Sequence, residues 1–315
     1  MTYSDASNAW LFPGQGSQKT GMGLSLSQAY PQAAAVFARA DEILGYALSN
    51  LCWHGPEAVL NETLHTQPAL LTHSVAVLRV LEAHTPAFRP QIVAGHSLGE
   101  ISALVAAGAL GFEDALRLVQ IRAESMQYAG EVHPGGMSAV LGLPIELVET
   151  ACEAASQAVE GQVWVANDNC PGQVVISGDD DALEDVQARL REAGARRVLR
   201  LAVSIAAHSP LMGPAQERFN AAVASTAFQA PEIDIIGNVT ATLLPSVEDI
   251  ARDLQAQLSA RVRWTETIEH IGRAGIQTFF EIGSGSVLVG LVRRILPDAR
   301  GIALDSPDTI QTYLT

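Results

Sequence analysis

One serine of the sequence lies between two glycines, in a setting where a serine can act as a nucleophile. The stretch VAGHSLGE, residues 93–100, contains the pattern G-x-S-x-G with Ser97 at its centre. An apolar run that predicts a buried strand precedes it, and a run that predicts a helix follows. Such a turn exposes the serine hydroxyl and points the helix N-terminus at the oxyanion formed on attack. The pattern indicates acyl chemistry at Ser97 and leaves the acyl acceptor open.

A nucleophilic serine needs a base, usually a histidine, and the chain has eight histidines. His96 adjoins Ser97 but leaves the turn in another direction, so we expect it to line the cleft or touch the substrate. His208, in VSIAAHSPLM, follows a predicted strand that returns from an inserted domain. That position is at the cleft between the domains, although spacing alone also allows a surface or core histidine.

A glycine-rich loop, FPGQGSQ at residues 12–18, follows the first predicted strand. It lacks the Lys and Ser/Thr of a P-loop, so a phosphate cradle or a plain turn is the alternative interpretation. In a serine acyltransferase, such a loop can give a second backbone N–H to the oxyanion hole. Losing one such donor costs about 3 to 4 kcal/mol.

The order of the predicted elements gives the fold class. Strands alternate with helices up to His133, which predicts an α/β domain with a mostly parallel sheet covered on both faces. After HPGG the order becomes βαββαβ, the ferredoxin-like unit, and helices and buried strands of the first kind then resume. We predict a large α/β domain formed by residues 1–134 and 205–315, interrupted by a small α+β subdomain at residues 135–204.

Composition limits the partners and the compartment. The chain has 315 residues, 48% of them hydrophobic, and a formal net charge of −15, which argues against nucleic acid or an anionic membrane as partner. Its longest apolar run has 12 residues, and the first residues lack the basic and apolar regions of a secretion signal. Three cysteines show no CxxC pair. We expect a cytoplasmic, reduced and monomeric protein without a metal or other cofactor.

The positive charges are not evenly spread. Five arginines gather in ARLREAGARRVLR: Arg189, Arg191, Arg196, Arg197 and Arg200. One interpretation is a solvated helix face and strand end. The other is a docking patch for an acidic partner.

Seven motifs together carry a family resemblance: FPGQGSQ, TQPALLTHSVA, GHSLGE, LRLVQIRAESMQ, NCPGQVVISG, HSPLM and EIGSGSVLVGL. In order and spacing they resemble the malonyl-CoA:acyl carrier protein transacylases, over essentially the whole chain. The resemblance implies a hydrolase-like α/β domain with a ferredoxin-like insertion. It also implies roles for individual residues. These are Ser97 as nucleophile, His208 as base, Gln15 and Leu98 as oxyanion-hole donors, Arg122 as carboxylate partner, Gln257 as the residue whose main-chain carbonyl orients the histidine, and Gln67, His96, Met126, Asn169 and Ala207 as cleft lining.

Arg122 bears on the choice of acceptor. A guanidinium binds a carboxylate through charge-assisted bonds worth about 1.5 to 3 kcal/mol each. A simple esterase has no use for a buried cation opposite its nucleophile. We therefore expect transfer of a malonyl group from malonyl-CoA to the thiol of a holo acyl carrier protein, by a ping-pong mechanism through a malonyl-serine.

Three alternatives stay open. They are a carrier-protein thioester hydrolase, a malonyl transferase subunit of a malonate decarboxylase, and a catalytically silent carrier-binding protein.

Two departures from the family pattern bear on selectivity and on the base. The residues that end at His208 are Ile-Ala-Ala-His, neither the malonyl form (His-Ala-Phe-His) nor the methylmalonyl form (Tyr-Ala-Ser-His) of polyketide acyltransferases, and small Ala207 leaves room for a branched acyl group. Ala260 and Arg261 replace an Asn-Pro pair near Gln257.

Overall fold

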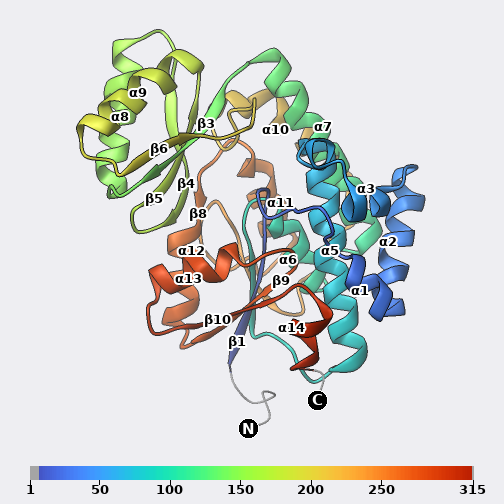
Figure 1. Ribbon diagram of the computed structural model, residues 1–315. Helices are drawn as coiled ribbons and strands as arrows, with labels where there is room; N and C mark the ends of the chain where they lie inside the picture. Colours follow the sequence, from blue (N-terminus) through green and yellow to red (C-terminus); the bar gives the residue numbers. More distant parts are fainter. Residues whose placement is uncertain (1–6, 314–315) are drawn as a thin grey trace.

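The computed structural model describes residues 7–313, which form two sheets with helices around them (Figure 1). The first sheet has the strand order β10-β9-β1-β2-β7, and all four neighbouring pairs are parallel. Its strands are β1 (Asn8–Phe12), β2 (Ile92–Gly95), β7 (Asp234–Ile236), β9 (Thr278–Ile282) and β10 (Arg300–Leu304). The α/β class and the parallel sheet predicted from the sequence are confirmed.

Both faces of this sheet are buried, as the unbroken apolar strand segments require. In β1, Trp10 and Phe12 pack into the larger core with helices such as α5 and α7, whereas Ala9 and Leu11 pack on the opposite side with α12 and α13. The helices of this unit are α1 (Leu24–Ala29), α2 (Pro31–Leu44), α3 (Leu48–His54), α4 (Glu57–Leu60), α5 (Thr63–His84), α6 (Gly99–Ala106), α7 (Phe112–Val132), α10 (Gly213–Ser225), α11 (Val247–Gln257), α12 (Trp264–Arg273), α13 (Val287–Ile295) and α14 (Pro307–Gln311), with a 3₁₀ turn, η2 (Pro210–Met212).

The second sheet has the order β6-β3-β5-β4-β8. Its first four strands, with two helices, follow the predicted βαββαβ order: β3 (Gly136–Leu141), α8 (Ile145–Ala158), β4 (Val163–Cys170), β5 (Gln173–Gly178), α9 (Asp180–Glu192) and β6 (Arg197–Arg200). Helices α8 and α9 cover one face of this sheet, on the outer side of the molecule in Figure 1. The other face is turned toward the first unit.

A short strand of the first unit, β8 (Val262–Arg263), completes the second sheet by pairing parallel to β4. The inserted segment is therefore joined to the rest of the molecule by a strand ladder as well as by its two chain connections. A two-residue strand has no periodicity that a sequence could reveal. The predicted domain limits at residues 135–204 stay a prediction.

The chain that returns from the second sheet differs from its prediction. The strand predicted to return from the inserted domain toward His208 ends at Arg200. Residues 201–207, called the strap below, run on without regular structure. One end of this stretch is fixed by the backbone bond from Leu201 to Met137, and the other by the bond from His208 to Leu258. His208 has a φ of 60°, which excludes it from a helix, and α10 begins at Gly213 after the 3₁₀ turn η2. No helix in the described part of the chain has the length and hydropathy of a membrane span.

Candidate active site

Ser97 lies in the turn between β2 and α6, where the sequence predicts a nucleophile. Its φ is 52°, a left-handed conformation that is strained for a residue with a side chain. The two glycines let backbone segments approach more closely than a side chain would allow. A Cβ on Gly95 would collide with the backbone of Gly99, and a Cβ on Gly99 would collide with the carbonyl of Phe12. The turn therefore brings three chain segments close together and presents the serine hydroxyl at the start of α6.

The structure brings His208 to Ser97 across 111 positions of sequence. Its Nε2 lies 2.7 Å from Ser97 Oγ. Its Nδ1 lies 2.9 Å from the main-chain carbonyl of Gln257 and 3.2 Å from that of Ala260. Carbonyls only accept hydrogen bonds, so Nδ1 carries the proton and the lone pair of Nε2 faces the serine. The turn with Ala260 in place of the family's asparagine still holds the histidine.

His208 is in the protonation state that a base needs. Burial, together with the nearby charge of Arg122, lowers the pKa of His208 to about 3. A group with so low a pKa is neutral at physiological pH, so the lone pair of Nε2 is free, although the same low pKa makes the imidazole a weak base. The imidazole is 5% exposed.

Arg122, on α7, is almost wholly buried at 1% exposure. One terminal nitrogen lies 3.1 Å from Ser97 Oγ and 2.8 Å from Gln257 Oε1, and the other lies 2.8 Å from Gln67 Oε1 and 3.3 Å from Met126 Sδ. Burial lowers its pKa to about 10, which leaves it charged at neutral pH. Within residues 7–313 no carboxylate forms an ion pair with it, and its Nε has no hydrogen-bond partner. The site thus contains a desolvated cation held by neutral groups, an arrangement suited to an incoming anion.

A cavity of about 310 Å³ opens above these residues. The sequence-predicted residues that line it are Gln15, His96, Ser97, Leu98, Arg122, Met126, Asn169, Ala207 and His208. The second sheet supplies the facing wall through residues such as Met137, Ala139 and Val175. His96 Nε2 lies 2.8 Å from Asn169 Oδ1 and so connects the serine turn with that wall.

Two predicted site residues lie behind the cavity surface. Gln67 was expected in the lining, but it is fully buried on α5 and holds Arg122 instead. The side chain of Gln257 is also buried and contacts Arg122 from the other side, in addition to the main-chain bond with His208. The sequence motifs place both residues at the site, but they do not show that the two side chains lie behind the cavity surface.

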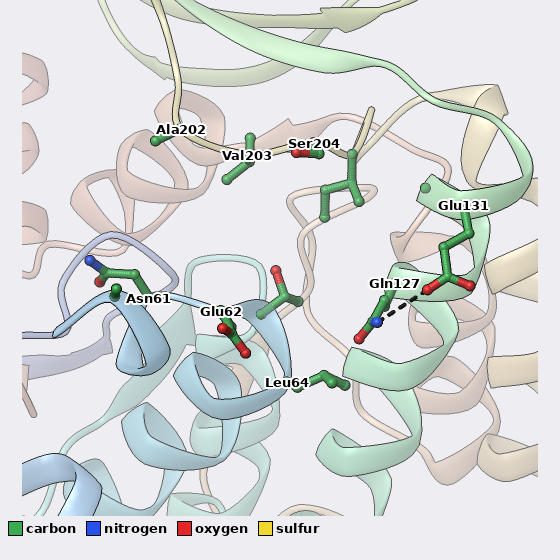
Figure 2. Close-up of a pocket in the computed structure, with 12 residues that line it drawn as sticks. Asn61, Glu62, Leu64, Gln127, Glu131, Ala202, Val203 and Ser204 are labelled. Atoms are coloured by element: carbon green, nitrogen blue, oxygen red, sulfur yellow. Dashed lines mark hydrogen bonds between the residues drawn. The ribbon is translucent and has the colours of Figure 1, made fainter. Parts of the chain in front are cut away.

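A second hollow of about 480 Å³ lies on the other side of the strap (Figure 2). Its walls come from Asn61 and Glu62 on one side and from Gln127 and Glu131 of α7 on the other. Val203 and Ile205 line both this groove and the Ser97 cavity. Gly130 lets the strap lie against α7, since a Cβ there would come within 2.6 Å of Ile205. The strap is thus the thin wall between the two hollows.

The five clustered arginines do not line the Ser97 cavity. Arg189 and Arg191 are on α9, which covers the face of the second sheet away from the cavity, and Arg189 pairs with Asp185. Arg200 pairs with Asp180. In the pairing of β3 with β6, Leu141 is opposite Arg197, so Arg197 lies on the sheet face that carries Met137 and Ala139. The other arginine of β6, Arg200, is opposite Ser138 and lies on the other face. Docking by the whole cluster stays a prediction.

Asn238 and Glu100 were not predicted as site residues. Asn238 Oδ1 accepts from Ser97 N at 2.7 Å, and Glu100 Oε2 accepts from Gln257 Nε2 at 2.8 Å. Asn238 follows β7, whose carboxyl end lies beside that of β2 in the parallel sheet. Ligand sites gather at such carboxyl ends, which is the signal that could have found it. Glu100 stands in the quoted GHSLGE motif, but no residue pattern gives it a role.

The comparisons with known proteins agree with this fold and site. The acyl transferase domain family matches residues 9–305, and the chain belongs to that family. The malonyl CoA-acyl carrier protein transacylase of Haemophilus influenzae is 44% identical over 298 residues, which cover 94% of this chain and 95% of the relative. An acyl carrier protein S-malonyltransferase from Vibrio cholerae has a TM-score of 0.93 at 41% identity, with 98% of this chain and 99% of that chain covered.

A further solved structure adds a partner to this comparison. It holds a type II polyketide-synthase acyl carrier protein in complex with its malonyl-transacylase. The TM-score to this chain is 0.94 at 41% identity, and the match covers 98% of this chain and 99% of that one. The predicted family resemblance and the hydrolase-like fold with its ferredoxin-like insertion are confirmed.

Proposed function

We propose that this protein transfers a malonyl group from malonyl-CoA to the pantetheine thiol of an acyl carrier protein, through a malonyl ester on Ser97. One observation carries the proposal. The charged guanidinium of Arg122 lies 3.1 Å from the serine oxygen, and its hydrogen-bond partners in the described chain are neutral groups. An acyl group that ends in a carboxylate supplies the missing partner, and a malonyl thioester is such a group.

In the first half-reaction, His208 Nε2 takes the proton of Ser97 as Oγ attacks the thioester carbonyl carbon. The backbone N–H groups of Gln15 and Leu98 stabilise the negative charge that forms on the carbonyl oxygen. The C–S bond then breaks, and His208 returns its proton to the sulfur of the leaving CoA.

In the second half-reaction the same groups work in the opposite direction. The pantetheine thiol gives its proton to His208 and attacks the ester carbonyl, and Ser97 Oγ leaves and regains the proton. Atoms and protons balance over the two halves, so the mechanism needs neither a metal nor a redox cofactor.

Arg122 acts on binding and on the base together. The malonyl carboxylate offsets its charge, and that charge is one of the two main causes of the low pKa of His208. The pKa of His208 therefore rises when a malonyl group is bound, and the histidine becomes a better proton acceptor. An acetyl group has no carboxylate and leaves the histidine weakly basic.

Intact-mass analysis tests the proposal. Enzyme mixed with malonyl-CoA should gain one malonyl increment, and Ser97→Ala should gain none. Addition of a holo carrier protein should move the increment to the carrier. Free malonate in place of the malonyl carrier would identify a thioester hydrolase, and no increment on the unmodified enzyme would identify a silent carrier-binding protein.

A further inference from the structure

A pair of buried carboxyl groups lies beneath the serine turn. Glu100, on α6, is fully buried, and Asp253, on α11, is 4% exposed. The backbone N–H of Asn238 lies 3.2 Å from an oxygen of each, and the two side chains are within hydrogen-bonding reach of each other. Two carboxylates so close in a buried site cannot both be ionised, so the pair holds one proton.

The neighbouring groups decide which residue carries the proton. Asp253 accepts from the backbone N–H groups of the 238–240 turn, and such a row of N–H donors favours the ionised form. Glu100 accepts on Oε2 alone, and its Oε1 is buried without an N–H or O–H donor. Burial and the charge of Asp253 hold the pKa of Glu100 well above its usual range. Glu100 is therefore the protonated member of the pair.

The pair connects with the reacting groups by two short paths. On one, the side chain of Asn238 accepts from Ser97 N at 2.7 Å and donates to Gly95 O at 2.7 Å, which clamps both ends of the strained turn. On the other, Gln257 donates from Nε2 to Glu100 and to Ser97 O, while its Oε1 accepts from Arg122. The orientation of that amide is fixed because Glu100 Oε2 accepts from it.

We propose that Glu100 shares its proton with ionised Asp253, and that this acid pair is a positioning device, acting on Ser97 through Asn238 and on Arg122 through Gln257. The positioning role rests on the proposed function, whereas the shared proton does not. Neither carboxyl group touches the substrate.

An asymmetry between two conservative variants tests this. Glu100→Gln replaces a protonated carboxyl by an amide that still donates to Asp253 and still accepts from Gln257. Ser97 acylation should stay within about threefold of the unmodified enzyme. Asp253→Asn turns N–H groups toward the donors of the 238–240 turn and should slow acylation by about tenfold or more. Equal losses in both variants, or an unaffected Asp253→Asn, would overturn the proposal.

Infrared spectroscopy tests for the shared proton without an activity assay. The unmodified protein should show a protonated-carboxyl band at neutral pH that loses intensity in Glu100→Gln. Burial raises the pKa of Glu281 to about 7, so Glu281→Gln identifies the part of the band that belongs to that residue. An unchanged band in Glu100→Gln would refute the shared proton even if Asp253→Asn did not fold. Glu281→Gln is the matched control, a buried carboxyl on β9 that accepts from α13 and should leave acylation unchanged. Sulfonylation of Ser97 by phenylmethylsulfonyl fluoride, run in parallel, requires a correctly positioned serine but no acyl donor. It therefore distinguishes a displaced serine from a wrong choice of acyl donor.

Discussion

Arg122 donates to the side-chain oxygen of Gln257 at 2.8 Å, and the main-chain carbonyl of the same glutamine accepts from His208 at 2.9 Å. One residue thus holds both the cation proposed to bind the malonyl carboxylate and the proposed base. The two contacts use different parts of Gln257, so they can be separated by substitution.

Gln257→Ala removes the side-chain contact and keeps the main-chain carbonyl. We expect the KM for malonyl-CoA to rise by about tenfold, the effect of one lost hydrogen bond to a charged group, with little change for acetyl-CoA. Steady-state kinetics with both donors measures this. Gln255→Ala, on the same helix, is the control. An equal loss with both donors would show that the side chain acts mainly on the serine turn, through its bond to Ser97 O.

Arg122→Ala should lower malonyl transfer by about 100-fold or more, because two charge-assisted bonds to the carboxylate disappear. The ratio of acetyl to malonyl turnover should rise, since an acetyl group no longer faces an unpaired cation. Arg117→Ala is a matched control, an arginine of the same helix with a side chain 54% exposed. Equal losses with the two donors would assign Arg122 a purely structural role.

The pH profile of kcat/KM should lack the fall on the acid side that protonation of an ordinary histidine causes. A pKa lowered to about 3 keeps His208 unprotonated throughout the weakly acidic range, so kcat/KM for acetyl-CoA should not fall near pH 6.5. In Arg122→Ala one cause of the lowering is gone, the pKa of His208 rises, and the acid limb should move to higher pH. Proton NMR of the imidazole provides the same titration directly. A limb that stays in place would mean that the charge of Arg122 does not act on His208.

Arg197→Glu should slow turnover of the carrier protein more than Arg189→Glu does. Carrier proteins are acidic, Arg197 is on the cavity-facing side of β6, and Arg189 is on the helix that covers the other side. Rim charges act mainly on encounter and are screened over about 8 Å at physiological salt. The difference should therefore be largest at low ionic strength, with Ser97 acylation by malonyl-CoA nearly unchanged. Identical kinetics in the two variants would make the cluster an ordinary solvated surface.

The sequence predicts the parts of this protein that local patterns control. Alternating strands and helices give the parallel sheet, and the glycines around Ser97 give the strained turn. The residues beneath the turn are different in kind. Asn238 and Glu100 contact the site through hydrogen bonds between residues more than 130 positions apart in the sequence. No residue pattern around either position indicates these contacts. Family motifs located Gln67, but only packing shows that it lies behind Arg122.

The ladder between β8 and β4 has a mechanical consequence for the histidine. His208 is bonded to Gln257, Leu258 and Ala260, and two positions later the chain enters the second sheet as β8. Arg261, between them, is anchored to α8 by its ion pair with Glu149. If the second sheet swung away from the first, it would pull this turn and draw the carbonyls away from the imidazole. Such an opening of the cleft would therefore weaken the hydrogen bonds that orient His208.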